Sequence, residues 1–192
     1  MSEIELGLVR KAQAGDRTAF EELVRRTTRL VYARLYLETG DRHWAEDLTQ
    51  ETWLLAYRAL PRLHDPESLR PWLLAIAQNV LAEALRRQAR KKRTLPPRVG
   101  NHVLPELPGP GPSPEEDAER ADLNNQVLAV LRSLPEDYRL PLTLRYVTGA
   151  DYETIETQLG LSNGALRGLL QRGLKLMRAR IEGIDRDKSF HS

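Results

Sequence analysis

The chain has 192 residues, of which 41% are hydrophobic and 6% aromatic, and its formal net charge is +2 with a pI of about 9.0. This length allows one or two small domains, and the lack of cysteine excludes disulfide bonds and thiolate metal sites. No uncharged run approaches membrane-spanning length, and the charged N-terminal residues argue against a signal peptide, so a soluble intracellular protein is expected.

The first 94 residues have helical periodicity, and strand-like alternation is absent. Asp16 and Asp41 are suited to cap helices, and Gly40 is suited to end one. Pro71 fits the first turn of a helix, where an amide donor is not needed. We therefore expect a small all-α domain over residues 1–94 with four helices, at about 3–14, 16–40, 41–61 and 69–93.

Proline and glycine dominate residues 95–113, which predicts a linker that is extended where it is proline-rich. Structure should resume at a capping box made by Ser113, Pro114 and Glu116. A further helix is expected to start at Pro135. Pro141 would cost about 3 kcal/mol in the regular interior of this helix, so a kink near Leu140 is expected.

Residues 151–181 show a helix-turn-helix pattern. Asp151 and Ser162 can cap its two helices, and a Leu-Gly-Leu turn at 159–161 separates them. The second helix has an apolar stripe and a polar, basic stripe, the latter made of Asn163, Arg167, Gln171, Lys175 and Arg178. A basic amphipathic helix is usually a solvated face, but here the caps and the turn agree with one DNA-binding motif.

No catalytic constellation is found. The sequence has no glycine-rich phosphate loop and no His-Glu-x-x-His motif, and its histidines are scattered without ligand spacing. We therefore expect no enzymatic activity, no cofactor and no metal site.

Two motifs in the N-terminal half carry a resemblance to a known family. Residues 44–58 read Trp-Ala-Glu-Asp-Leu-Thr-Gln-Glu-Thr-Trp-Leu-Leu-Ala-Tyr-Arg, and residues 69–79 read Leu-Arg-Pro-Trp-Leu-Leu-Ala-Ile-Ala-Gln-Asn. With the linker and Leu-Pro-Glu-Asp-Tyr-Arg at 134–139, the chain resembles bacterial RNA polymerase sigma factors of the extracytoplasmic-function (ECF) type, from about residue 16 to residue 180.

The resemblance implies an all-α protein of two small helical domains. A sigma region 2-like domain (1–94) and a helix-turn-helix, sigma region 4-like domain (114–182) would be joined by the linker (95–113), with a polar tail at 183–192. It implies a cytoplasmic bacterial factor, without membrane insertion, that directs polymerase to specific promoters and assists promoter melting. The expected partners are the polymerase core (β′ clamp helices and β flap) and promoter DNA; many family members are also held inactive by an anti-sigma factor.

The helix at 41–61 matches the family helix that docks on the coiled-coil clamp of the polymerase β′ subunit. A partly acidic helix face would meet a basic coiled coil, with a tryptophan as apolar anchor. The plainer interpretation is that its carboxylates pair with arginines one turn away. The matching residues are Asp47, Gln50, Glu51 and Trp53.

The loop at 63–68 and the helix after it match the part that captures the −10 element as a single strand. Because unstacking a base costs free energy, the protein must hold the base outside the stack, while arginines hold phosphates and make binding salt-dependent. The matching residues are His64, Asp65, Ser68, Asn79, Arg86, Arg87 and Arg90.

The helix-turn-helix would read the −35 element as duplex, through donors that suit phosphates and major-groove base edges. The matching residues are Ser162, Asn163, Arg167, Gln171, Arg172 and Lys175.

Some positions depart from the family pattern, and they suggest weaker phosphate contact. Arginine is frequent where this chain has Ala75, Gln78 and Leu169, an aromatic residue is usual at Leu69, and alanine is usual at Glu156. A carboxylate at the last of these positions must reach solvent or an arginine. Two alternatives stay open: a dimeric helix-turn-helix regulator, although no spare helix offers a dimerisation surface, and an interaction module that has lost DNA binding.

Overall fold

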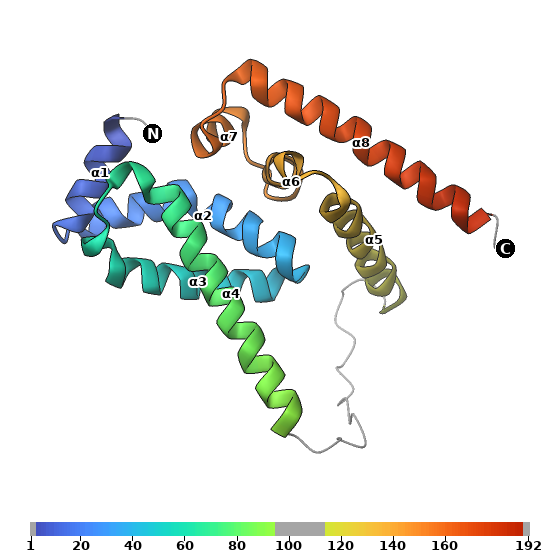
Figure 1. Cartoon of the computed structure of the whole chain (residues 1–192), viewed down its shortest axis with the longest axis horizontal. Helices are drawn as coiled ribbons and strands as arrows, with labels where there is room; N and C mark the ends of the chain where they lie inside the picture. Colours follow the sequence, from blue (N-terminus) through green and yellow to red (C-terminus); the bar gives the residue numbers. More distant parts are fainter. Residues whose placement is uncertain (1–2, 95–113, 190–192) are drawn as a thin grey trace.

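The computed structural model describes the backbone of residues 3–94 and 114–189 and the side chains of residues 3–90 and 122–183. Within these ranges the chain forms helices and no strand, so the predicted all-α class is confirmed. No helix there is long and apolar enough to cross a membrane. Figure 1 shows two groups of helices lying against each other, α1–α4 and α5–α8. The predicted linker and Ser113 of the capping box lie outside the described residues.

The N-terminal group forms as its local signals predict. The Asp16 carboxylate accepts a hydrogen bond from the Ala19 amide at 3.0 Å, and the Asp41 carboxylate accepts one from the Trp44 amide at 3.0 Å. Gly40 adopts the left-handed conformation (φ 74°) that ends a helix. The helices are α1 (Glu3–Gln13), α2 (Arg17–Thr39), α3 (Arg42–Ala59) and α4 (Leu69–Thr94), with short 3-10 turns at Leu60–Arg62 and Pro66–Ser68 between the last two.

The N-terminal core lies among these four helices. In α3 the buried stripe is Ala45, Leu48, Thr52 and Ala56. Helical spacing predicts that Leu55, seven residues after Leu48, also faces inward, but this prediction is wrong, because the Leu55 side chain is 41% exposed.

The C-terminal group contains α5 (Pro114–Ser133), α6 (Glu136–Leu142), a π-helical turn (Thr143–Val147), α7 (Tyr152–Leu159) and α8 (Asn163–Ser189). The irregularity expected near Leu140 instead lies in the π turn, where the Thr148 amide donates to the Thr143 carbonyl five residues earlier. The last helix continues past Ile181, its expected end, because no proline stops it there. Helical spacing from Val127 predicts Leu123 inside, but the Leu123 side chain is 61% exposed and Leu128 is buried instead.

The two groups of helices share α2. Leu30, Ala33 and Leu37 of this helix are buried in the C-terminal core with Leu134, Leu142, Leu144 and Ile155. Polar contacts reinforce this packing: Arg132 donates to the carbonyls of Leu37 (2.6 Å) and Glu38 (2.9 Å), satisfying free groups at the C-terminal end of α2. Because α2 has apolar residues on more than one side, it is buried by the N-terminal helices on one side and by the C-terminal helices on another. The domains are therefore in contact.

Gly173 lies where α8 packs closely against α6. A Cβ atom at this position would lie 2.9 Å from Cδ1 of Leu142, a side chain that is 1% exposed. We expect Gly173→Val to lower the free energy of unfolding by about 1–3 kcal/mol through overpacking, measured by urea denaturation. The control is Gly183→Ala, which has open space around it and should stabilise the helix by about 0.5–1 kcal/mol. Equal stability of Gly173→Val and the wild-type protein would show that the helices can separate freely.

Candidate nucleic-acid and protein interfaces

One face of α3 is exposed. Asp47 and Gln50 are exposed, and Asp47 forms no ion pair with any residue that the structure describes. Glu51 is half-buried, and its carboxylate lies 2.8 Å from Arg87 Nη2 on α4. The arginine that neutralises Glu51 therefore comes from another helix and not from the next turn.

Trp53 does not project from this face. Its ring packs edge-on against Phe20, with centroids 6.0 Å apart, on the N-terminal core. Its buried Nε1 has no hydrogen-bond partner among the described residues. Leu54 is 63% exposed instead, one turn beyond Gln50 on the same face. Helical spacing from Asp47 would have indicated Leu54, which sequence reasoning missed.

The loop before α4 is held by its own side chains. Asp65 accepts hydrogen bonds from the Glu67 amide (3.0 Å) and the Ser68 hydroxyl (2.5 Å), and these bonds lower the pKa of the Asp65 carboxyl. Gln13 of α1 donates to the carbonyl of Leu63 at 2.7 Å and fixes the start of the loop. His64 is exposed. The predicted loop residues thus lie together, although Ser68 and Asp65 are hydrogen-bonded to each other.

The outward side of α4 carries exposed Asn79 and the predicted arginines. Glu83 lies 3.3 Å from Arg86 and 2.8 Å from Arg90, and both hydrogen bonds lower the pKa of its carboxyl. The bond from Glu51 raises the pKa of Arg87. Ion pairs this exposed contribute little to stability, so a phosphate can displace the carboxylates at small cost.

The helix-turn-helix forms with the caps that the sequence predicts. The Asp151 carboxylate accepts from the Thr154 amide at 2.7 Å, and Thr154 lowers the pKa of this carboxyl. The Ser162 hydroxyl accepts from the Ala165 amide at 3.3 Å, and Gly160 in the turn has φ 65°. These local bonds present α8 on α7 with its polar stripe outward.

That polar stripe is open along its length. Its residues Asn163, Arg167, Gln171, Lys175 and Arg178 are exposed, and so are the predicted contact residues Ser162 and Arg172 beside it. The Arg167 guanidinium lies 5.7 Å from the centre of the Tyr152 ring, and that of Arg145 lies 5.2 Å from it. Cation–π attraction of this kind restrains Arg167. Sequence reasoning did not indicate Tyr152, because its ring faces a residue of the next helix.

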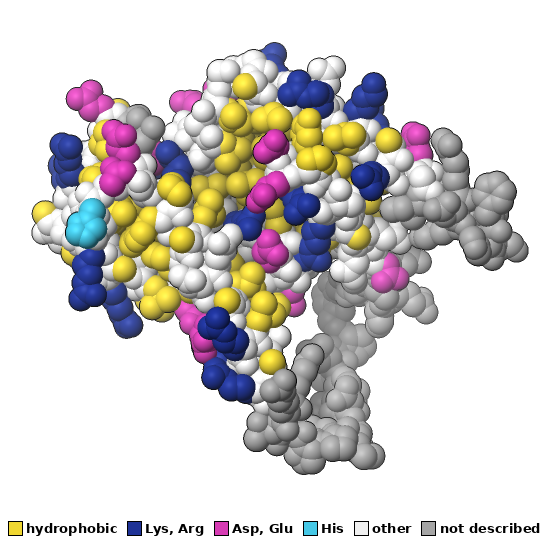
Figure 2. Space-filling model, viewed as in Figure 1, with side chains coloured by type: hydrophobic (Ala, Val, Ile, Leu, Met, Phe, Trp, Pro, Cys, Tyr) yellow, Lys and Arg dark blue, Asp and Glu magenta, His cyan; other side chains and the backbone are white. Residues whose placement is uncertain are grey.

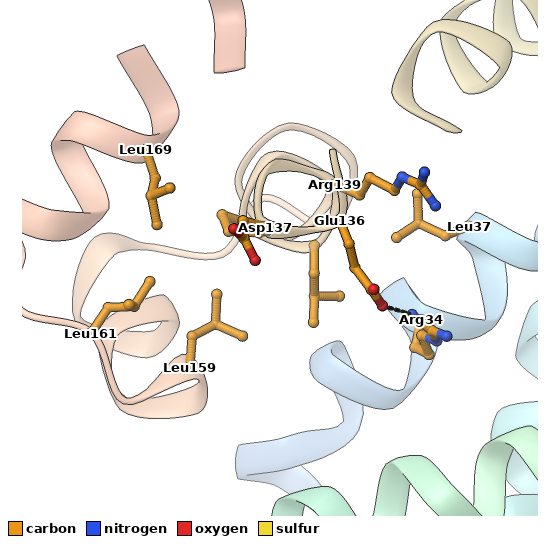
Figure 3. A pocket seen from close by; sticks show the side chains of 10 residues that line it. Arg34, Leu37, Glu136, Asp137, Arg139, Leu159, Leu161 and Leu169 are labelled. Carbon is orange, nitrogen blue, oxygen red and sulfur yellow. Dashed lines mark ion pairs between the residues drawn. The ribbon is translucent and has the colours of Figure 1, made fainter. Parts of the chain in front are cut away.

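Two of the departures from the family pattern have structural explanations. Leu169 is half-buried and lines a cavity of about 370 Å³ with Leu159 and Leu161 (Figure 3). It thus belongs to an apolar surface between the domains, bordered by the Arg34–Glu136 ion pair at 3.6 Å. Figure 2, which has the same view as Figure 1, shows hydrophobic side chains gathered near the middle of the molecule. Among the described residues, the Glu156 carboxylate pairs with an amide and not with an arginine: it accepts a hydrogen bond from Asn163 Nδ2 at 2.5 Å.

Comparison with known proteins identifies both groups of helices. Residues 23–91 match the family model of sigma-70 region 2, and residues 124–177 match that of sigma-70 region 4. Among solved structures, that of CnrH in complex with the cytosolic domain of CnrY is 22% identical, with alignment over 94% of this chain and 99% of that chain and a TM-score of 0.49.

Curated relatives carry sigma-factor names. The ECF RNA polymerase sigma factor SigE of Mycolicibacterium smegmatis is 32% identical over 85% of this chain, which spans 63% of that relative, under two thirds of its length. The RNA polymerase sigma-H factor of Pseudomonas aeruginosa is 31% identical over 93% of this chain and 91% of its own length. With region 2 and region 4 in one all-α chain, the protein belongs to the ECF type of the sigma-70 family of RNA polymerase sigma factors.

Proposed function

We propose that this protein directs a bacterial RNA polymerase to specific promoters and assists opening of the −10 element. The observation that supports this most is a pair of exposed surfaces, one on each of the two domains that match the sigma-70 family models. One is the α3 face around Asp47 and Gln50, and the other is the α8 stripe that starts at Asn163. As an initiation factor the chain would contribute binding rather than chemistry, in the cytoplasm where polymerase works.

The α3 face suits the polymerase core. Asp47 and Gln50 offer exposed polar groups, and Leu54 offers an exposed apolar side chain between them and the end of the helix. Interfaces depend on a central apolar anchor with complementary charge around it. We therefore assign the anchor to Leu54 and give Trp53 the role of holding α3 in place, with Glu51 at the edge of the interface.

The α4 face suits a strand of DNA that has left the duplex. Asn79 can bond a base edge, while Arg86, Arg87 and Arg90 can hold the backbone. His64, Asp65 and Ser68 lie in the loop that would border the flipped base. Binding there should weaken steeply with salt, because each neutralised phosphate releases counterions.

The helix-turn-helix suits the duplex −35 element. Two promoter elements about 25 base pairs apart are separated by roughly 85 Å along the helix axis. The two domains here share α2, whose 23 residues are about 35 Å long. We infer that the packing of the C-terminal domain on α2 opens on the polymerase, so that each domain reaches its own promoter element. The β flap is the expected support for the C-terminal domain, and an anti-sigma factor is a further partner expected from the family.

The docking assignment can be tested by measuring the affinity of the full chain for bacterial core polymerase. The double substitution Asp47→Ala and Gln50→Ala should weaken binding by about tenfold or more, since contacts at an interface centre commonly cost over 1 kcal/mol each. Leu54→Ser should weaken it comparably. The matched control is Glu21→Ala, an exposed carboxylate on α2. If all variants bind like wild type, polymerase docks elsewhere.

A further inference from the structure

The contact between Glu156 and Asn163 joins the two helices of the helix-turn-helix. Glu156 lies on α7 and is half-buried, while Asn163 is the first residue of α8 and is exposed. Asn163 Nδ2 donates to Glu156 Oε1 at 2.5 Å, and Glu156 forms no ion pair with any described lysine or arginine. The Glu156 carboxylate therefore orients the Asn163 amide, which belongs to the surface proposed to read DNA.

We infer that Glu156 is a specificity-determining positioning residue. It would turn Asn163 so that the −35 subsite opposite this side chain selects a base with an exocyclic amino group, adenine or cytosine, over guanine or thymine. This inference rests on the proposed reading of the −35 element by α8.

The selectivity follows from the chemistry of the amide. A free asparagine can present either its NH₂ group or its carbonyl oxygen to a base, with nearly equal ease. An ionised carboxylate only accepts hydrogen bonds, so the amide must direct Nδ2 toward Glu156 and Oδ1 away from it. In the major groove adenine N6 and cytosine N4 are donors, whereas guanine O6 and N7 and thymine O4 are acceptors. The Asn163 Oδ1 atom can therefore accept a hydrogen bond from adenine or cytosine, whereas the acceptor atoms of guanine and thymine repel it.

The charge of Glu156 acts in the same direction. The carboxylate lies against the first residue of α8, where free amides and the helix dipole would otherwise attract a DNA phosphate. A negative charge there weakens this sequence-independent attraction. Glu156 thus lowers affinity for DNA in general while sharpening the choice of base. Its replacement should raise non-specific binding and reduce discrimination together.

A purely structural role for the Glu156–Asn163 contact makes a different prediction. A clasp that only stabilises the turn would change the melting temperature and weaken all base preferences equally. A positioning role changes the preference at one promoter position and leaves the others as they were. The base profile therefore separates the two roles.

The experiment uses the full chain with bacterial core polymerase and a promoter library randomised over the −35 element, with bound sequences counted. Wild type should favour adenine or cytosine at one position by about tenfold. Glu156→Ala should reduce this preference to below about threefold at that position only. Glu156→Gln should do the same, because glutamine can donate as well as accept and lets the Asn163 amide turn over. Glu153→Ala removes an exposed carboxylate of the same helix and should leave the profile unchanged.

A second variant keeps the test valid if Glu156→Ala folds poorly. Asn163→Ala retains the carboxylate and should remove the preference at the same position, and the two losses should not add. A profile of Glu156→Ala identical to wild type, or a loss at a position that Asn163→Ala does not affect, overturns the inference. A wild-type profile without any base preference would instead contradict −35 recognition itself.

Discussion

Replacing Arg167 with alanine should lower transcription from promoters that depend on a −35 element by about tenfold, and up to about a hundredfold. Arg167 is exposed on the α8 stripe and held over the Tyr152 ring at 5.7 Å, so its guanidinium is partly ordered before DNA arrives. A side chain that bonds a base edge in two places contributes about 1–3 kcal/mol of discrimination. Run-off transcription from paired promoters with and without the −35 element measures the loss.

Two further substitutions sharpen this test. Arg180→Ala removes an exposed arginine from another side of α8 and should change transcription little. Tyr152→Leu keeps apolar packing but removes the ring, and should cost about twofold to fivefold, because exposed cation–π contacts contribute about 0.5–1 kcal/mol. Equal losses for Arg167→Ala and Arg180→Ala would mean that the stripe acts only through its overall charge.

Replacing Arg70 with methionine should cause the largest loss of stability, about 3–5 kcal/mol, because it removes one partner of a buried ion pair. Arg70 Nη2 lies 2.7 Å and 2.6 Å from the two oxygens of Glu5. The side chain of Glu5 is 2% exposed and that of Arg70 is 12% exposed, so the pair is largely removed from water. This pair ties α1 to α4. Urea unfolding at neutral pH measures the change.

The control for this prediction is the double variant Glu5→Met and Arg70→Met. Removing both charges and filling the space with apolar side chains should recover most of the stability. If the double variant is as unstable as Arg70→Met alone, lost packing rather than an uncompensated charge causes the effect.

Features that depend on a few neighbouring residues could be predicted from the sequence. Asp16, Asp41, Asp151 and Ser162 each bond an amide three residues ahead, so their capping role can be inferred from local spacing. The helix-turn-helix and the α3 face follow from the same short-range information together with the family motifs. The structure places most of the predicted residues on three exposed surfaces, while Trp53 packs against the N-terminal core, and their binding roles stay predictions.

Features that depend on distant residues could not be predicted. The Gln158 side chain donates to the carbonyl of Arg26, 132 residues away, and Glu5 pairs with a residue 65 positions later. The packing of α2 on both cores and the inward turn of Trp53 also depend on which surfaces meet. Helical periodicity shows that a face is apolar or polar but does not name its neighbour.

The most direct measurement is run-off transcription by bacterial core polymerase with and without this chain, with mapping of transcript start sites. As a sigma factor, the chain should join the core and create starts at a fixed distance from a shared pair of promoter elements, and the Asp47→Ala and Gln50→Ala variant should reduce them. A chain that leaves start sites unchanged, or that binds a palindrome as a stable dimer without polymerase, would contradict this function.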